Sequence, residues 1–187
     1  MRGLFGRMRD AWQAGRRAKE LHGTTLDDPA FGRITYDRDG HWKTAASLGP
    51  FGEGIEVLAN APGGEPPTDA QRSAYRAFTG DLAGFHRKIE GLTQEFYMDV
   101  VLGTWRRQEL EERPDEEDVI LRETPDLDEP GLLWKWLRRL SVTVPRDQEG
   151  GWLVGLFWAD CRWDEEHGWG IYLRNGEVST GEAWLEE

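Results

Sequence analysis

The segment TDAQRSAYRAFTGDLAGFHRKIEGLTQEF, residues 68–96, decides the fold of this chain. Its apolar side chains recur in steps of three and four residues and form one helical stripe, which must pack against another part of the protein. Thr68 and Gln71 have the spacing of a capping box and predict where the helix begins. Glycine weakens a helix interior, so the glycines of the segment predict a break into two helices. The stripe consists of Tyr75, Phe78, Leu82, Phe85, Ile89, Leu92 and Phe96, and the glycines are Gly80, Gly84 and Gly91.

Segments with the composition of β-strands lie on both sides of this helical region. Two of their connections, Asp39-Gly40 and Asn175-Gly176, are strong signals for tight hairpin turns. The pattern predicts an α+β fold, in which antiparallel meanders form one sheet or two abutting ones and the helices of residues 68–112 pack against a face. The predicted strands are residues 33–37, 41–46, 54–59, 141–144, 151–159, 169–173 and 177–179.

Three further features refine this prediction. The strand at 151–159 is apolar on both faces, which is typical of a central strand that is covered on both sides. A second helix continues to about Glu112, and a short one follows Glu129-Pro130-Gly131. Asp27-Asp28-Pro29 is interpreted as a linker before the first strand. Residues 30–187 are therefore expected to form a single domain.

Residues 1–22 differ chemically from the rest of the chain. They contain six Lys and Arg residues against Asp10 and Glu20, a net charge of +4, and their apolar residues have helical spacing. The pattern predicts a basic amphipathic helix that docks on the acidic body of the protein. Binding to an anionic membrane surface is the alternative for this segment.

Composition narrows the classes of function. The net charge of −12 disfavours nucleic acid as a partner and favours a basic protein. No apolar stretch approaches the roughly 20 residues that span a bilayer, and the one cysteine, Cys161, cannot form an intrachain disulfide. We therefore expect a cytoplasmic protein.

The densest polar cluster contains Asp164, Glu166 and His167. These side chains are nearly consecutive, so they do not have the spacing that aligns metal ligands on a helix. A structural turn that starts at Trp163-Asp164 and ends at Gly168 is the favoured interpretation. Catalysis by Cys161 with His167 as base is disfavoured because no third, orienting group is evident. The sequence predicts no catalytic residue, metal ligand or cofactor-binding residue.

The C-terminal region resembles a known group of sequences. The stretch Cys161–Ile171 contains W-D-x-E-H-G-x-G-I and precedes the Asn175-Gly176 turn, and it resembles a family of uncharacterised bacterial domains. Residues 132–137 and 142–144 are similar as well, so the resemblance covers roughly residues 130–181. Some members of that family are similar to immunity-like proteins encoded beside bacterial toxins. The resemblance therefore suggests an association with immunity-like proteins and says nothing about activity.

Together these features predict a non-catalytic protein-binding protein, an immunity-type or adaptor protein that binds a basic partner. The acidic stretch 109–118 and the tryptophan before it are the expected contacts. Two alternatives stay open: a metal-assisted hydrolase that uses the 164–167 cluster, and a membrane-surface or assembly-associated protein targeted by residues 1–22. The predicted partner-binding residues are Trp105, Glu109, Glu111, Glu112, Glu116, Glu117 and Asp118.

Overall fold

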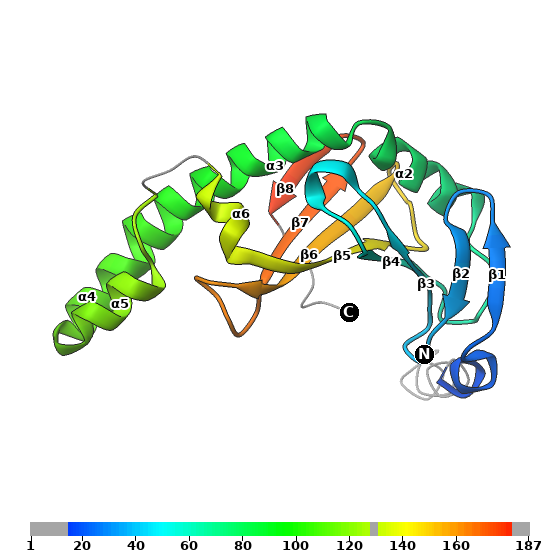
Figure 1. The fold of residues 1–187 in the computed structure, drawn as a ribbon, viewed down its shortest axis with the longest axis horizontal. Helices are drawn as coiled ribbons and strands as arrows, with labels where there is room; N and C mark the ends of the chain where they lie inside the picture. Colours follow the sequence, from blue (N-terminus) through cyan, green and yellow to red (C-terminus); the bar gives the residue numbers. More distant parts are fainter. Residues whose placement is uncertain (1–14, 128–130, 181–187) are drawn as a thin grey trace, which may run out of the picture.

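A computed structural model describes residues 15–127 and 131–180, and their strands form a single sheet with helices over one face (Figure 1). The strands lie side by side in the order in which they occur in the chain. Neighbours are antiparallel except β4 and β5, which are parallel. The prediction of an α+β fold is confirmed, and the two meanders join in one sheet. The strands are β1 (Thr25–Asp28), β2 (Gly32–Tyr36), β3 (His41–Ala46), β4 (Ile55–Asn60), β5 (Leu137–Val144), β6 (Leu153–Cys161), β7 (Trp169–Arg174) and β8 (Glu177–Thr180).

The connection between the parallel strands β4 and β5 contains most of the helical structure. A parallel pair needs such a crossover, because the chain must return to the starting edge before it pairs again. The helices are α2 (Asp69–Gly80), α3 (Leu82–Phe96), α4 (Arg107–Glu112), α5 (Glu117–Glu123) and α6 (Leu132–Trp136), with the 3-10 turns η1 (Gly49–Phe51) and η3 (Pro114–Glu116) and the π-helix η2 (Tyr97–Arg106).

The predicted capping box begins α2 and also fastens this helix to the sheet. Thr68 Oγ1 accepts a hydrogen bond from the Gln71 backbone N–H at 3.1 Å, and Gln71 Oε1 accepts one from the Thr68 N–H at 3.0 Å. The Gln71 amide nitrogen then donates to the carbonyls of Asn60, at 3.0 Å, and Val144, at 2.9 Å. These carbonyls end β4 and β5, so one buried side chain joins the parallel pair to the helix that covers it.

The predicted apolar stripe lies in the core. Phe78, Phe85 and Ile89 are buried, and Leu82 is half-buried. The predicted break falls between Gly80 and Leu82, where Asp81 caps α3 by accepting the N–H of Gly84 at 3.0 Å. Gly84 itself is buried, and a Cβ there would lie 2.1 Å from the Asp81 carboxylate. Gly84 therefore leaves room for the Asp81 cap at the junction of the two helices.

Several predicted boundaries were wrong. Residues 25–28 are the edge strand β1 and not a linker. Asp28 is buried there because its carboxylate accepts the N–H groups of Ala30 and Phe31 and a hydrogen bond from Arg72 Nε at 2.8 Å. Strand β5 begins at Leu137, four residues before the predicted start. The hydrogen bonds that satisfy the buried Asp28 come from the backbone and from Arg72, and the pattern of apolar residues along the sequence does not reveal them.

The strand with two apolar faces, β6, lies in the interior of the sheet between β5 and β7, as predicted. Figure 1 shows helices over one face of the sheet only, so the expected second covering layer is not among the described residues. On the face away from the helices, Leu153 and Phe157 are half-buried and line a hollow.

The described part of the N-terminal segment is helical over residues 15–21. Ala18 is buried there and Leu21 is half-buried against the core, so this part docks on the body of the protein. Residues 1–14, where most of the predicted amphipathic helix falls, lie outside the described residues. No helix among the described residues combines the length and the apolar character needed to cross a membrane.

We predict that Gln71→Leu destabilises the protein by about 1–3 kcal/mol or more, because the Asn60 and Val144 carbonyls lose a buried hydrogen-bond donor. Urea denaturation measures this free energy of unfolding. The control is Gln94→Leu at an exposed position of α3, which should change stability by no more than about 0.5 kcal/mol. Equal stabilities of the two variants would contradict the role assigned to Gln71.

We predict that Phe85→Ala costs about 3–5 kcal/mol, as is usual for a buried phenylalanine. Phe85 packs against Phe78 and Trp152, with ring centroids 6.2 and 5.9 Å away, so its removal leaves a cavity between α3 and the sheet. Thermal and urea unfolding provide the measurement, with Arg87→Ala at an exposed position of the same helix as the control. A Phe85→Ala protein that unfolds like the wild type would refute this packing.

Candidate functional site

A helical arm projects from one end of the sheet (Figure 1). We use "the arm" for residues 97–123, which comprise η2, α4, η3 and α5. The backbone stays helical through Tyr97 and Arg107, so α3, η2 and α4 form one continuous rod where the sequence predicted separate helices. A π-helix of ten residues is uncommon, and such segments occur frequently at functional sites.

The far end of the arm reverses direction at Arg113-Pro114. Arg113 has φ −132° and ψ 62°, outside the helical region, because the following proline ring disfavours a helical residue before it. Its guanidinium donates to the carboxylates of Glu109 and Glu116, the latter at 2.9 Å. One arginine therefore joins the outgoing helix to the returning one and partly compensates the acidic charge around it.

The two ends of the arm are joined at its root by hydrogen bonds from η2 to the residues that follow α5. Tyr97 Oη donates to the Pro125 carbonyl at 2.7 Å, and Arg106 Nη1 donates to the Thr124 carbonyl at 3.0 Å and to Asp126 at 2.7 Å. Burial raises the pKa of Tyr97, so this phenol stays protonated and remains a donor. The two ends of the arm are thus held together at the root, and the far end extends away from the sheet (Figure 1).

The structure brings all seven predicted partner-binding residues together on the arm. Trp105 lies in η2, three of the glutamates lie in α4, and the remaining three residues surround the reversal at the start of α5. Glu109 is half-buried beside Arg113, and the other six are exposed. Their binding role stays a prediction. The α4 residues are Glu109, Glu111 and Glu112, and those beyond the reversal are Glu116, Glu117 and Asp118.

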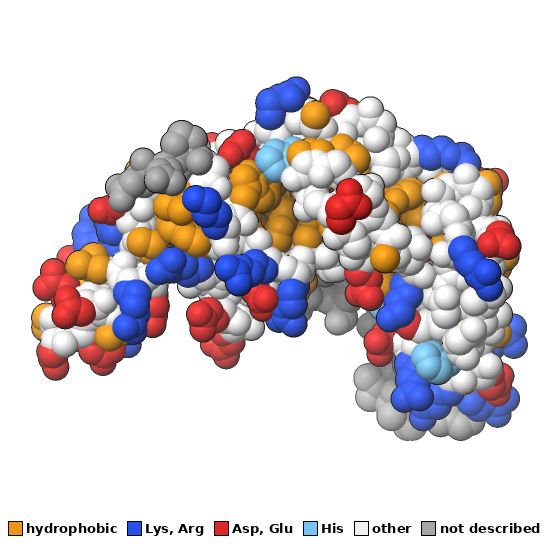
Figure 2. Space-filling model, viewed as in Figure 1, with side chains coloured by type: hydrophobic (Ala, Val, Ile, Leu, Met, Phe, Trp, Pro, Cys, Tyr) orange, Lys and Arg blue, Asp and Glu red, His pale blue; other side chains and the backbone are white. Residues whose placement is uncertain are grey.

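Charge is concentrated at the far end of the arm (Figure 2). Residues 109–118 contain seven carboxylates and a single arginine, a net charge of −6, which is half the net charge of the whole chain. The hydrogen bond that Arg113 donates to the Glu109 carboxylate raises the pKa of Arg113, which remains charged. A compact surface of this charge attracts cations and accelerates encounters with a basic protein.

Large apolar side chains are also exposed on the arm. Among the described residues, the large hydrophobic side chains classed as exposed are Met98, Trp105 and Leu121, at 46%, 39% and 39%. All three belong to the arm, where Trp105 packs edge-on against Phe96 with ring centroids 5.8 Å apart. Sequence reasoning found Trp105 and missed Met98 and Leu121. Met98 lies off the apolar helical stripe, which is a weak indication that it is exposed. Nothing in the sequence around Leu121 indicates its exposure.

The 162–168 segment is a turn between β6 and β7, as predicted. Asp164 Oδ1 accepts the His167 N–H at 2.9 Å and lies 3.1 Å from His167 Nδ1. Gly168 has φ +75°, and a Cβ there would lie 2.5 Å from the Trp158 carbonyl oxygen, so only glycine fits. Among the described residues, no group of three or more His, Cys, Asp and Glu side chains is placed to hold a metal ion.

Cys161, the other residue considered for chemistry, ends strand β6 and is 1% exposed. Burial raises the pKa of its thiol to about 12, which disfavours the thiolate that a nucleophile requires. The backbone N–H of Asp164 donates to the Cys161 carbonyl at 3.2 Å and begins the turn. The surroundings of Cys161 are those of a structural residue.

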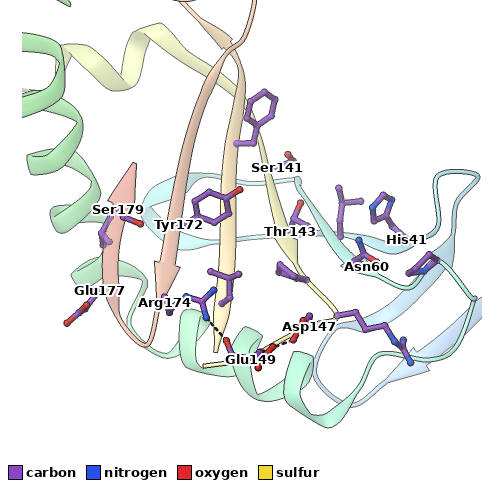
Figure 3. A pocket seen from close by; sticks show the side chains of 17 residues that line it. His41, Asn60, Ser141, Thr143, Asp147, Glu149, Tyr172, Arg174, Glu177 and Ser179 are labelled. Carbon is purple, nitrogen blue, oxygen red and sulfur yellow. Dashed lines mark hydrogen bonds between the residues drawn. The ribbon is translucent and has the colours of Figure 1, made fainter. Parts of the chain in front are cut away.

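The face of the sheet opposite the helices forms an open hollow of about 1320 Å³ (Figure 3). Hydroxyl and amide side chains such as Thr143 and Asn60 line it together with half-buried Tyr172. At its rim, Arg174 Nη1 donates to the Glu149 carbonyl at 2.6 Å. The predicted partner-binding residues lie on the arm and not in this hollow.

Comparison with known proteins agrees with the sequence resemblance at the level of a family. A family model described as a domain of unknown function (DUF6985) matches residues 30–183. This span includes all the strands except β1, the whole arm and the 162–168 turn, and it excludes the basic N-terminal segment. Neither the curated proteins nor the solved structures contain a significant match.

We predict that Cys161 is alkylated by iodoacetamide at pH 8 roughly 1000-fold more slowly in the folded protein than in urea. The reason is that its pKa near 12 leaves little thiolate, whereas an unfolded cysteine has a pKa near 8.5. Mass spectrometry follows the modification. Folded-state labelling as fast as that of the unfolded chain would mean that the thiol is accessible and ionised, and would restore Cys161 as a candidate nucleophile.

Proposed function

The chain belongs to the DUF6985 family of domains of unknown function, and we propose that it is a non-catalytic protein that binds a basic protein partner through the arm. An immunity-type or adaptor role, in which binding occludes the partner, is the form of this function that we favour. We further propose a cytoplasmic location, since the one cysteine of the chain cannot form an intrachain disulfide.

The observation that carries the proposal is the coincidence of two surface features on the arm. The large hydrophobic side chains exposed among the described residues lie on the same element as residues 109–118, whose net charge is −6. Each feature alone is common on protein surfaces. Together they have the composition of a recognition surface, in which aromatic and methionine side chains are enriched and charged groups lie around them.

The two features would contribute to different steps of binding. Carboxylates act over about a Debye length, so those at the far end of the arm would steer a basic partner toward it and raise the association rate. Trp105 acts only on contact, because burying a large aromatic side chain removes apolar surface from water. Its contribution should therefore appear mainly in the dissociation rate.

The shape of the arm suits a role in which it covers a concave surface of the partner. It projects from the sheet as a paired helical element, and its root is held by Tyr97 and Arg106 (Figure 1). A projecting element can enter a cleft that a flat surface cannot. A basic partner with a concave surface would therefore receive the arm with little conformational rearrangement of either protein.

We predict that Glu111→Lys, Glu112→Lys, Glu116→Lys and Glu117→Lys together slow association with the partner several-fold at low salt. The partner is first captured from the native organism, and the rates are then measured by surface plasmon resonance. The effect should largely disappear at 1 M salt, where the screening length falls to about 3 Å. The fold should survive, because all four side chains are exposed and Arg113, which loses Glu116, keeps its pairing with Glu109.

A matched control separates local steering from total charge. Changing Asp39, Glu149, Glu165 and Glu166 to lysine alters the net charge by the same amount at exposed positions outside the arm. This control should slow association much less, and Trp105→Ala should mainly accelerate dissociation. An acidic partner, or equal effects of the two charge sets, would refute the proposal. Failure to capture any macromolecule would count against it as well.

A further inference from the structure

The chain carries its own basic segment, and its charge is complementary to that of the arm. Residues 1–22 have a net charge of +4, of which residues 1–14 contribute Arg2, Arg7 and Arg9 against Asp10. The same fourteen residues include apolar side chains of the kind that pack on an exposed tryptophan or methionine. These apolar residues are Leu4, Phe5, Met8, Ala11 and Trp12.

The described end of the basic segment, residues 15–21, lies away from the arm. The buried Ala18 holds residues 15–21 on the body beside β1–β3, and Figure 1 places this end of the molecule opposite the arm. The Leu21 side chain packs close to Gly64 and so fixes the end of this helix. Residue 15, at which residues 1–14 join the described part of the chain, therefore lies at the end of the molecule opposite the arm.

We propose that the arm of one copy binds residues 1–14 of a second copy. Charge complementarity argues for this occupant, because the arm supplies exposed carboxylates and apolar side chains and the segment supplies both counterparts. The inference rests on the proposed role of the arm as a binding surface. It adds a specific ligand, which is part of this chain.

Such a contact joins two different surfaces, so it is heterologous. Each copy retains one unoccupied arm or one unoccupied basic segment after the first contact, and growth continues unless a ring closes. A basic partner protein would compete for the same arm and would disperse the assembly. Self-association would then keep the arm covered until the partner is present.

Two variants that each lack one half of the contact test this proposal. The first lacks residues 1–14 and retains residues 15–21, whose Ala18 is part of the core. The second is the full chain with Glu111→Lys, Glu112→Lys, Glu116→Lys and Glu117→Lys. Sedimentation velocity at low salt measures the association of the wild type, of each variant alone and of their mixture. Circular dichroism verifies that both variants are folded.

The wild type should form concentration-dependent oligomers that dissociate at 1 M salt, where screening reaches about 3 Å. Each variant alone should be monomeric. Their mixture should form a 1:1 heterodimer and nothing larger, because the truncated chain supplies an intact arm and the charge-reversed chain supplies an intact basic segment. Oligomers formed by either variant alone, or a mixture that stays monomeric, would refute the proposal.

A synthetic peptide with the sequence of residues 1–14 gives an independent measurement. Labelled with a fluorophore, it should bind the truncated protein in a salt-dependent way, and its affinity should fall at least several-fold when the arm is charge-reversed. A control peptide carries Arg2→Gln, Arg7→Gln and Arg9→Gln and should bind much more weakly. A wild type that is monomeric and does not bind the peptide would eliminate this inference, while the truncated protein would still test binding of a foreign basic partner.

Discussion

The architecture depends on the hydrogen bonds that Gln71 makes at the ends of the two parallel strands. Antiparallel hairpins form the sheet on either side of this point, and each could form from short-range contacts alone. The pairing of β4 with β5 has no such local origin, because residues 61–136 separate the strands. The buried Gln71 amide satisfies the Asn60 and Val144 carbonyls and also caps the start of α2. The pairing of β4 with β5 and the docking of the helix therefore depend on the same side chain.

This constraint also explains why the candidate site is an arm. The crossover from β4 to β5 needs enough chain to return across the sheet, and α2, α3 and α6 lie over the body. The chain between α3 and α6 is longer than the crossover needs. This additional length forms η2, α4 and α5, which project from the body. Tyr97 and Val101 at the root of the arm belong to the core, whereas residues 109–118 at its far end are largely exposed and can vary in surface chemistry without disturbing the core. The acidic and apolar groups of the arm lie in this surplus segment.

The tryptophan-rich turn that prompted the sequence resemblance has a structural explanation in the same region. Trp163 and Trp136 pack on Tyr97 at the root of the arm, with ring centroids 5.2 and 5.5 Å from it. Trp169 packs on Trp163 and donates from Nε1 to Thr93 Oγ1 at 3.2 Å. The turn therefore positions aromatic rings that support the arm. Asp164 and His167 contribute by holding the turn.

Local chemistry made much of the fold predictable. The capping box, the break at Gly80 and the two hairpin turns each depend on residues a few positions apart, and all appear in the structure. Strand β1 was missed because its Asp27-Asp28 sequence has no apolar signal, and Arg72, 44 residues later, accounts for the buried Asp28. The sequence singled out the acidic run 109–118 as an expected contact surface, but it did not predict helix α5 or the projecting arm. The exposure of Met98 and Leu121 followed only from how the helices pack in three dimensions.

The arm also shows why a charged surface can be informative about function. Mutual repulsion among the seven carboxylates of residues 109–118 opposes folding of the arm, and Arg113 offsets only part of it. Of α4, η3 and α5, Ile120 is the buried hydrophobic residue, so little apolar burial compensates locally. Cationic groups bound to the arm would relieve this repulsion. The free energy released by removing the repulsion would then favour binding. Relief of this repulsion by a basic group would favour the binding role that we propose for the arm.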